Sequence, residues 1–63
     1  MTVFTFRFQY SINDDIQERY VVADSEESAW EKILLHFEQM HLKGFAKPYF
    51  ITDPTVEFDN VII

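Results

Sequence analysis

The chain has 63 residues, a formal net charge of −6 and no cysteine. These totals allow one small domain at most, exclude disulfides and thiolate metal sites, and leave an apolar core or a partner to stabilise the fold. Eleven acidic residues against five lysines and arginines argue against direct binding to nucleic acid or to an anionic membrane, since both need basic groups. The hydrophobic fraction of 48% is too high for a disordered chain.

The first third of the chain is predicted to form a β-hairpin. In the segment FTFRFQY aromatic residues alternate with polar ones, which predicts a half-buried strand over Val3–Tyr10. The turn follows at SINDD (11–15), because Ser, Asn and Asp side chains bond nearby backbone. In the second strand, Ile16, Tyr20 and Val22 are expected to share one face.

An amphipathic helix is predicted to begin near Asp24 or Ser25 and to end around residue 41. Asp24 and Glu27 have capping-box spacing. Gly44 is expected to take the left-handed conformation that closes many helices. The side chains predicted to face the core are Trp30, Ile33, Leu34, Phe37 and His41, with Ala29 and Met40 at the edge.

The last third is predicted to return to the sheet. The sequence allows a short strand at Tyr49–Ile51 and predicts a longer one over Val56–Ile62, with Val56, Phe58 and Ile62 on one face. The expected fold is therefore α+β, a single ββαβ domain over residues 1–63. Its antiparallel sheet has three strands, or four if the short segment joins, in the order 2-1-3 with the helix on one face.

The other face of the sheet is expected to be open to solvent. Arginines there would pair with acids such as Glu57 or Asp59 across the strands. The side chains predicted to lie on this face are Thr5, Arg7, Gln9, Gln17, Arg19, Glu57 and Asp59.

The helix also carries an acidic stripe. Asp24, Glu27, Glu31 and Glu38 fall within about 60° of arc on an ideal helix, and no base follows four residues after Glu27 or Glu31. The functional reading is a negative surface for a basic protein, with Leu35 beside it as an apolar contact. The alternative is a solvated face of an acidic protein. The predicted partner-binding residues are Asp24, Glu27, Glu31, Leu35 and Glu38.

No motif for chemistry is found. His36 and His41 are five residues apart, whereas zinc-binding histidines on one helix are four apart. NDDIQER lacks the glycine and terminal glutamate of a calcium loop. The aromatics of the first strand are expected in the core, not on a base-stacking face. No catalytic residue, cofactor or metal is therefore predicted, and the chain is not expected to be an enzyme.

The tail NVII is apolar. Val61 and Ile63 are expected to point to the open face and to pack with Val3 and Val21 into a patch for a dimer or a partner, unless the strand end frays. The N-terminus lacks the basic leader and apolar run of a signal peptide. No apolar run is long enough to cross a bilayer, so a soluble cytoplasmic protein is expected.

The segment RYVVADSEESAWEKILLHF, followed by Gly44-Phe45, resembles a pattern of short proteins from bacteriophages and other mobile elements. The pattern is a strand, A-[DE]-[ST]-x-E-x-A, an amphipathic helix and a closing strand. The layout is similar to that of the small acidic podophage inhibitor of bacterial RNA polymerase. The resemblance covers about a third of the chain and implies a class of function, the binding of a host protein.

Three functional hypotheses follow. The first is a small acidic module, phage-like, that binds and modulates or inhibits a host protein with a basic surface, such as a nucleic-acid enzyme or a defence effector. It would bind neither nucleic acid nor membrane directly. The alternative is a structural or assembly protein that forms a homodimer or larger homo-oligomer through its sheet edge or apolar tail. The third is a binder of a small ligand or of nucleic acid.

Overall fold

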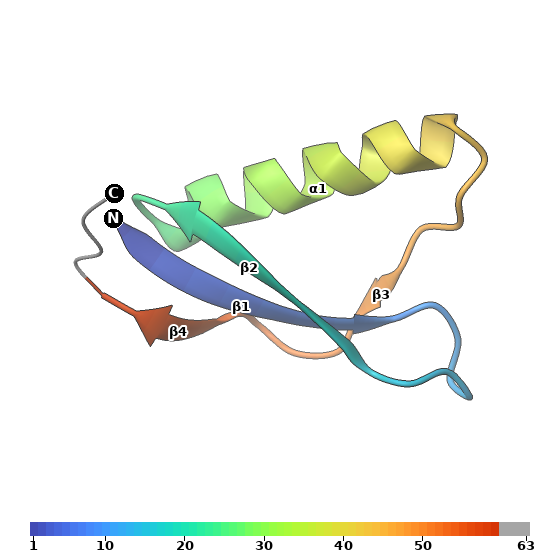
Figure 1. The fold of residues 1–63 in the computed structure, drawn as a ribbon, viewed down its shortest axis with the longest axis horizontal. Helices are drawn as coiled ribbons and strands as arrows, with labels where there is room; N and C mark the ends of the chain where they lie inside the picture. The colour runs from blue at the N-terminus through green and yellow to red at the C-terminus, as the bar shows by residue number, and fades with distance from the viewer. Residues whose placement is uncertain (60–63) are drawn as a thin grey trace.

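The computed structural model describes residues 1–59 of the chain. A four-stranded antiparallel sheet carries one helix on one face (Figure 1), which confirms the predicted α+β class. The short segment at Tyr49 does form a strand. The elements in chain order are β1 (Thr2–Gln9), β2 (Gln17–Ala23), α1 (Glu26–Leu42), β3 (Tyr49–Phe50) and β4 (Thr55–Phe58).

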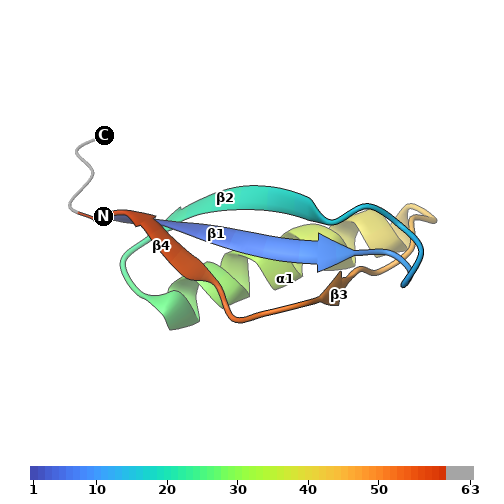
Figure 2. The same ribbon diagram turned by 90° about the horizontal axis from the view of Figure 1, so that it is seen from below.

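The aromatic strand β1 lies in the centre of the sheet, as predicted. It pairs with β2 along one side. On its other side β3 pairs with the C-terminal part of β1 and β4 with the N-terminal part, so these two strands share one edge (Figure 2). The edge is interrupted before the buried Pro54, which has no N–H to donate to a ladder. The expected 2-1-3 order is therefore confirmed.

The faces of β2 are the reverse of those predicted. Val21 lies opposite Phe4 and Arg19 opposite Phe6, so Arg19 is on the helix side of the sheet. Tyr20 lies opposite Thr5 on the open face and is 63% exposed. Both alternating sets of residues in β2 contain apolar side chains, so the register of its pairing with β1 decides which set faces the core. A shift of one residue would exchange the two faces.

Because the faces of β2 are reversed, several predictions for individual residues were wrong. Val22 lies on the open face with Tyr20, and Ile16 precedes β2 and is exposed. Gln17, predicted on the open face, lies opposite Phe8 on the helix side.

Strand β4 contains an irregularity that the sequence pattern did not show. Val3 pairs with Phe58 while its neighbour Phe4 pairs with Val56, which leaves Glu57 as the extra residue of a bulge. Because Val3 and Phe4 point to opposite faces, Val56 and Phe58 do so as well. The prediction that these two residues share a face was therefore wrong.

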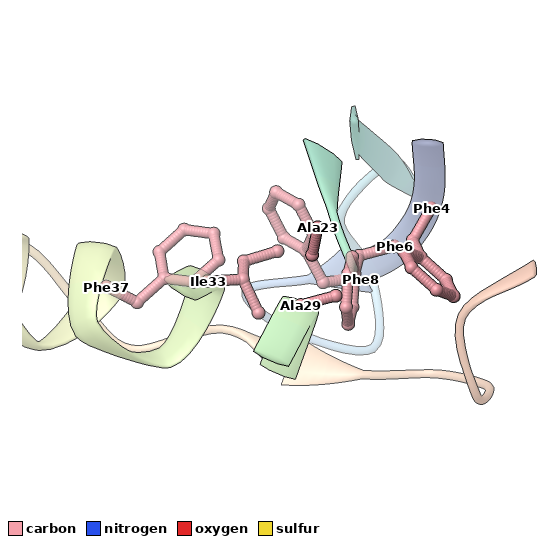
Figure 3. Packing of buried hydrophobic residues seen from close by; sticks show 7 residues of the cluster. All are labelled: Phe4, Phe6, Phe8, Ala23, Ala29, Ile33 and Phe37. Atoms are coloured by element: carbon pink, nitrogen blue, oxygen red, sulfur yellow. The ribbon is translucent and has the colours of Figure 1, made fainter. Parts of the chain in front are cut away.

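The core lies between β1 and α1 (Figure 3). Phe8 packs edge-to-face on Phe37, with ring centroids 5.0 Å apart, and half-buried Trp30 packs on Phe6 at 4.8 Å. The phenylalanines of β1 are thus buried under the helix, as predicted. The buried hydrophobic residues are Phe4, Phe6, Phe8, Ala23, Ala29, Ile33 and Phe37.

The buried face of α1 is centred on Ala29, Ile33 and Phe37, which recur every four residues. Leu34 is 51% exposed and His41 is also exposed, so the prediction that both face the core was wrong. The buried face is therefore rotated from the predicted one, away from Leu34 and towards Ala29.

Both ends of α1 are fixed by local hydrogen bonds. Ser25 is the N-cap, and its Oγ accepts from the backbone N–H of Ser28 at 3.2 Å, so the predicted capping box that begins at Asp24 does not cap the helix. At the other end Gly44 has φ of +97°, as expected. The Gly44 and Phe45 N–H groups donate to the carbonyls of residues 41 and 40, which is a Schellman motif.

Candidate partner-binding surface

The helix brings three of the predicted acids together with Leu35. Glu27, Glu31, Leu35 and Glu38 are all exposed on α1, on the side away from the core residues, and are called the acidic helix surface below. Glu27, Glu31 and Leu35 follow at four-residue intervals and are therefore neighbours along the helix. Asp24 is exposed but precedes the N-cap, so helical geometry does not place it in line with the others.

The charge of this surface is concentrated towards the N-terminal part of the helix. Glu38 Oε2 lies 2.9 Å from Lys47 Nζ, and the hydrogen bond and charge of Lys47 hold the pKa of that carboxyl below its ordinary value. Within residues 1–59, neither Glu27 nor Glu31 has a basic side chain within ion-pair distance. Neither carboxylate is therefore paired with a cation of the described chain, although Glu27 lies in the first turn, where the helix dipole favours an acid.

Three exposed leucines also lie on α1, and the exposure of two of these leucines was not predicted from the sequence. Leu35 is 59% exposed, as predicted, and Leu42 and Leu34 are 78% and 51% exposed. Leu42 lies seven residues after Leu35, a spacing that places both on one side of a helix and could have identified it. Leu34 could not be found in this way, because its exposure depends on how the helix is rotated against the sheet.

An apolar groove adjoins the acidic helix surface between α1 and β3. Its volume is about 290 Å³, and the Glu38–Lys47 ion pair is part of its wall. The acidic helix surface therefore borders a hollow that can take an apolar side chain. The lining residues are Leu34, Phe37, Glu38, Lys47, Pro48 and Phe50.

The polar centre of the open sheet face is internally bonded. Arg7 lies 3.2 Å from Glu18 and donates to Thr55 Oγ1 at 3.0 Å, while Thr5 donates to Glu57 at 3.1 Å. Arg7 therefore pairs with an acid of β2 rather than with the predicted acids of the last strand. These groups satisfy one another and offer little unpaired charge to a partner.

One end of the open face is apolar. Val22, Val3 and Phe58 lie side by side across β2, β1 and β4. The sequence predicted a patch here in which Val3 and Val21 pack with the C-terminal tail. In the structure Val21 is on the helix side, and Val22 takes its place. Val61 and Ile63, predicted to complete the patch, lie outside the described residues.

Arg19 and His41 have specific neighbours of their own. Arg19, predicted opposite the acids of the last strand, instead lies with its guanidinium carbon 5.5 Å from the centre of the Phe8 ring. His41 Nδ1 lies 3.0 Å from the carbonyl oxygen of Phe45, at the C-terminal end of α1. Within residues 1–59 no three metal-ligating side chains gather, and no helix of this range is long and apolar enough to cross a membrane.

Comparison with known proteins adds no relative. No protein-family model, curated protein or solved structure matches the chain. The function is therefore inferred from the surfaces of this chain alone.

Proposed function

We propose that this protein is a small acidic binding module that binds a host protein with a basic surface and modulates or inhibits it. The observation that carries the proposal is the acidic helix surface, where Glu27 and Glu31 have no ion-pair partner within residues 1–59 and the exposed Leu35 follows Glu31 by one turn. The class of target is a nucleic-acid enzyme or a defence effector, because such proteins have basic surfaces that hold nucleic acid.

The acidic residues and the apolar residues of this surface would contribute differently to the binding of a partner. Charge complementarity raises the association rate and selects the partner. Most of the affinity in protein interfaces comes from a few buried anchors. Leu34, Leu35 and the groove beside β3 supply the apolar area for that purpose. A helix built for stability alone would place lysine four residues after glutamate, whereas here Leu35 follows Glu31.

The experiment is affinity capture of the tagged protein from bacterial lysate at low and high salt, with mass spectrometry of the retained proteins. Binding of the purified target is then compared between the native chain and the Glu27→Lys, Glu31→Lys double variant. We expect the double variant to lose at least about tenfold in affinity, and salt to weaken binding of the native chain.

The matched control is the Asp14→Lys, Asp15→Lys double variant. It makes the same change in net charge, but in the exposed turn between β1 and β2. We expect it to bind the target nearly as well as the native chain. Equal losses in the two variants would mean that only net charge matters, and no loss in either would contradict the acidic helix surface as the binding site.

A specific observation also favours the alternative, a homo-oligomer. The row of Val22, Val3 and Phe58 on the open sheet face is apolar, and Phe58 is 62% exposed. Light scattering at high protein concentration tests this function. A dimer that Phe58→Lys dissociates would support it, and a strict monomer would exclude it.

A further inference from the structure

Strand β2 is the long, regular edge of the sheet. Within residues 1–59 it pairs with β1 alone, over seven residues and without a bulge. The opposite edge is divided between β3, which has two residues, and β4, which has four residues and a bulge, with the buried Pro54 between them. Unpaired backbone groups along an edge are a template for another strand. Of the two edges described, β2 is therefore the one more open to pairing with a second copy of the chain.

The backbone groups of β2 that point away from the sheet belong to Glu18, Tyr20 and Val22. The carbonyl of Arg7 accepts from the N–H of Ile51 at 3.0 Å, so the backbone groups of Arg7 face the β3 side of β1. Glu18 lies opposite Arg7 in the register, and its own groups therefore face away from β1. Tyr20 and Val22 follow at two-residue intervals and face the same way. An antiparallel strand docked along this segment would use all three carbonyls as acceptors.

Side-chain cations already occupy two of these three carbonyls. Lys32 Nζ, from α1, donates to the carbonyl of Val22 at 2.7 Å. Arg19 Nη1 donates to the carbonyl of Glu18 at 2.9 Å. The two carbonyls are four residues apart, which is about 13 Å along a strand, so the cations cover the edge on both sides of Tyr20. Neither cation has an acidic partner within residues 1–59 that would draw it away from the edge.

Symmetry adds a second obstacle to a second copy. Two antiparallel β2 strands joined edge to edge are related by a two-fold axis perpendicular to the sheet, which keeps both helices on the same face. Arg19 and Lys32 of the two copies would then lie on the same side of the joint. Like charges brought together across a strand pair are destabilising.

We propose that Arg19 and Lys32 protect the edge of β2 and prevent its pairing with a second copy of the chain. They occupy the acceptors that such a strand needs and add like charges at the joint. A lysine at an edge is a common means of this protection. The inference goes beyond the proposed function and uses none of the acidic helix surface.

The test removes both cations in the Arg19→Met, Lys32→Met double variant, because methionine is long but has no donor. We expect its dimer dissociation constant, measured by sedimentation over a range of concentrations, to be at least about tenfold lower than that of the native chain. The formal net charge changes from −6 to −8, which by itself would oppose association.

Hydrogen exchange locates the contact. The amides of Glu18, Tyr20 and Val22 should exchange more slowly as the concentration of the double variant rises, because a docked strand accepts from these N–H groups. Unchanged self-association, or a dimer in which these amides stay unprotected, would overturn the proposal.

Single variants supply the controls. Lys32→Met should associate in the same way but less strongly than the double variant, and it serves as the test if circular dichroism shows that the double variant does not fold. Lys32→Arg keeps the charge and a donor and should behave as the native chain does. Lys43→Met adds the same apolar side chain at the helix end and should also stay as the native chain is. Equal association in Lys43→Met would overturn the assignment.

The edge dimer is distinguishable from the homo-oligomer considered above. Phe58 lies on β4, across the sheet from β2, so Phe58→Lys should leave the dimer of the double variant intact. Dissociation by Phe58→Lys would place the contact on the open face and overturn the proposal. No partner protein is needed, so the result is separate from that of the proposed function.

Discussion

Glu38 is the residue of the acidic helix surface whose charge the fold compensates. Its partner Lys47 lies nine positions later, and the chain returns past the helix because Gly44 ends α1 in a Schellman motif. Helical spacing alone places Glu38 in a stripe with Glu27 and Glu31. The loop after the helix then supplies Lys47, which forms an ion pair with Glu38 and with neither of the other two glutamates.

The ion pair predicts a pH effect at this residue. The pKa of Glu38 is lowered in the folded chain by Lys47, so the stabilisation is present above the ordinary value of 4.5 and is lost as pH falls through the lowered pKa. We expect Lys47→Met to raise the titration midpoint of the Glu38 carboxyl, measured by NMR. Lys43→Met serves as the control and should leave the midpoint in place. An unchanged midpoint in Lys47→Met would show that the pair does not persist in solution.

At the scale of the element, the C-terminus of α1 depends on backbone conformation. Gly44 has φ of +97°, and a Cβ added there would meet no atom within 4 Å. The requirement for glycine therefore comes from the left-handed backbone rather than from crowding. The caps at Ser25 and Gly44 are local signals, which is why the sequence placed both ends of the helix within one or two residues.

We expect Gly44→Ala to reduce the free energy of unfolding by about 1–2 kcal/mol, the cost of left-handed backbone for an ordinary residue. Gly44→Asn should lose less, since asparagine tolerates this conformation. Urea unfolding of the three proteins measures both differences. A neutral Gly44→Ala variant, or an equal loss for alanine and asparagine, would contradict the conformational explanation.

At the scale of the whole molecule, charge is divided between the flanks of one helix. The acidic helix surface adjoins the groove beside β3. A second groove, lined by Arg19, Lys32 and His36 among others and called the basic groove below, lies beside β2. The formal net charge of −6 on 63 residues also implies repulsion within the folded chain. Salt screens this repulsion over a Debye length of about 10 Å at 0.1 M.

We therefore expect the thermal midpoint of unfolding to be higher in 0.3 M than in 0.01 M sodium chloride. The Asp14→Lys, Asp15→Lys variant adds two positive units at each site, which changes the formal net charge from −6 to −2, and its salt-dependent increase should be smaller. Calorimetry at the two salt concentrations measures the difference. A midpoint that falls with salt would mean that attractive pairs such as Arg7–Glu18 outweigh the general repulsion.

The sequence by itself determined the central strand, the extent of the helix, its C-terminal cap and the strand order. Each depends on short-range physics: the alternation of FTFRFQY, the helical spacing of the apolar residues and the conformational freedom of Gly44. The exposure of Glu27, Glu31 and Leu35 could also be predicted, because residues opposite the core face of a helix meet solvent.

Only the tertiary structure decided the inner face of β2, the bulge at Glu57, the Glu38–Lys47 pair and the basic groove. Val21 and Val22 are equally apolar, so local pattern gives no preference, and the pairing of β2 with β1 makes the choice. That choice turns Arg19 towards the helix side, where Lys32 also lies. Arg19 and Lys32 line the same groove because the register of β2 turns Arg19 to the helix side, and the period of a strand does not encode that register.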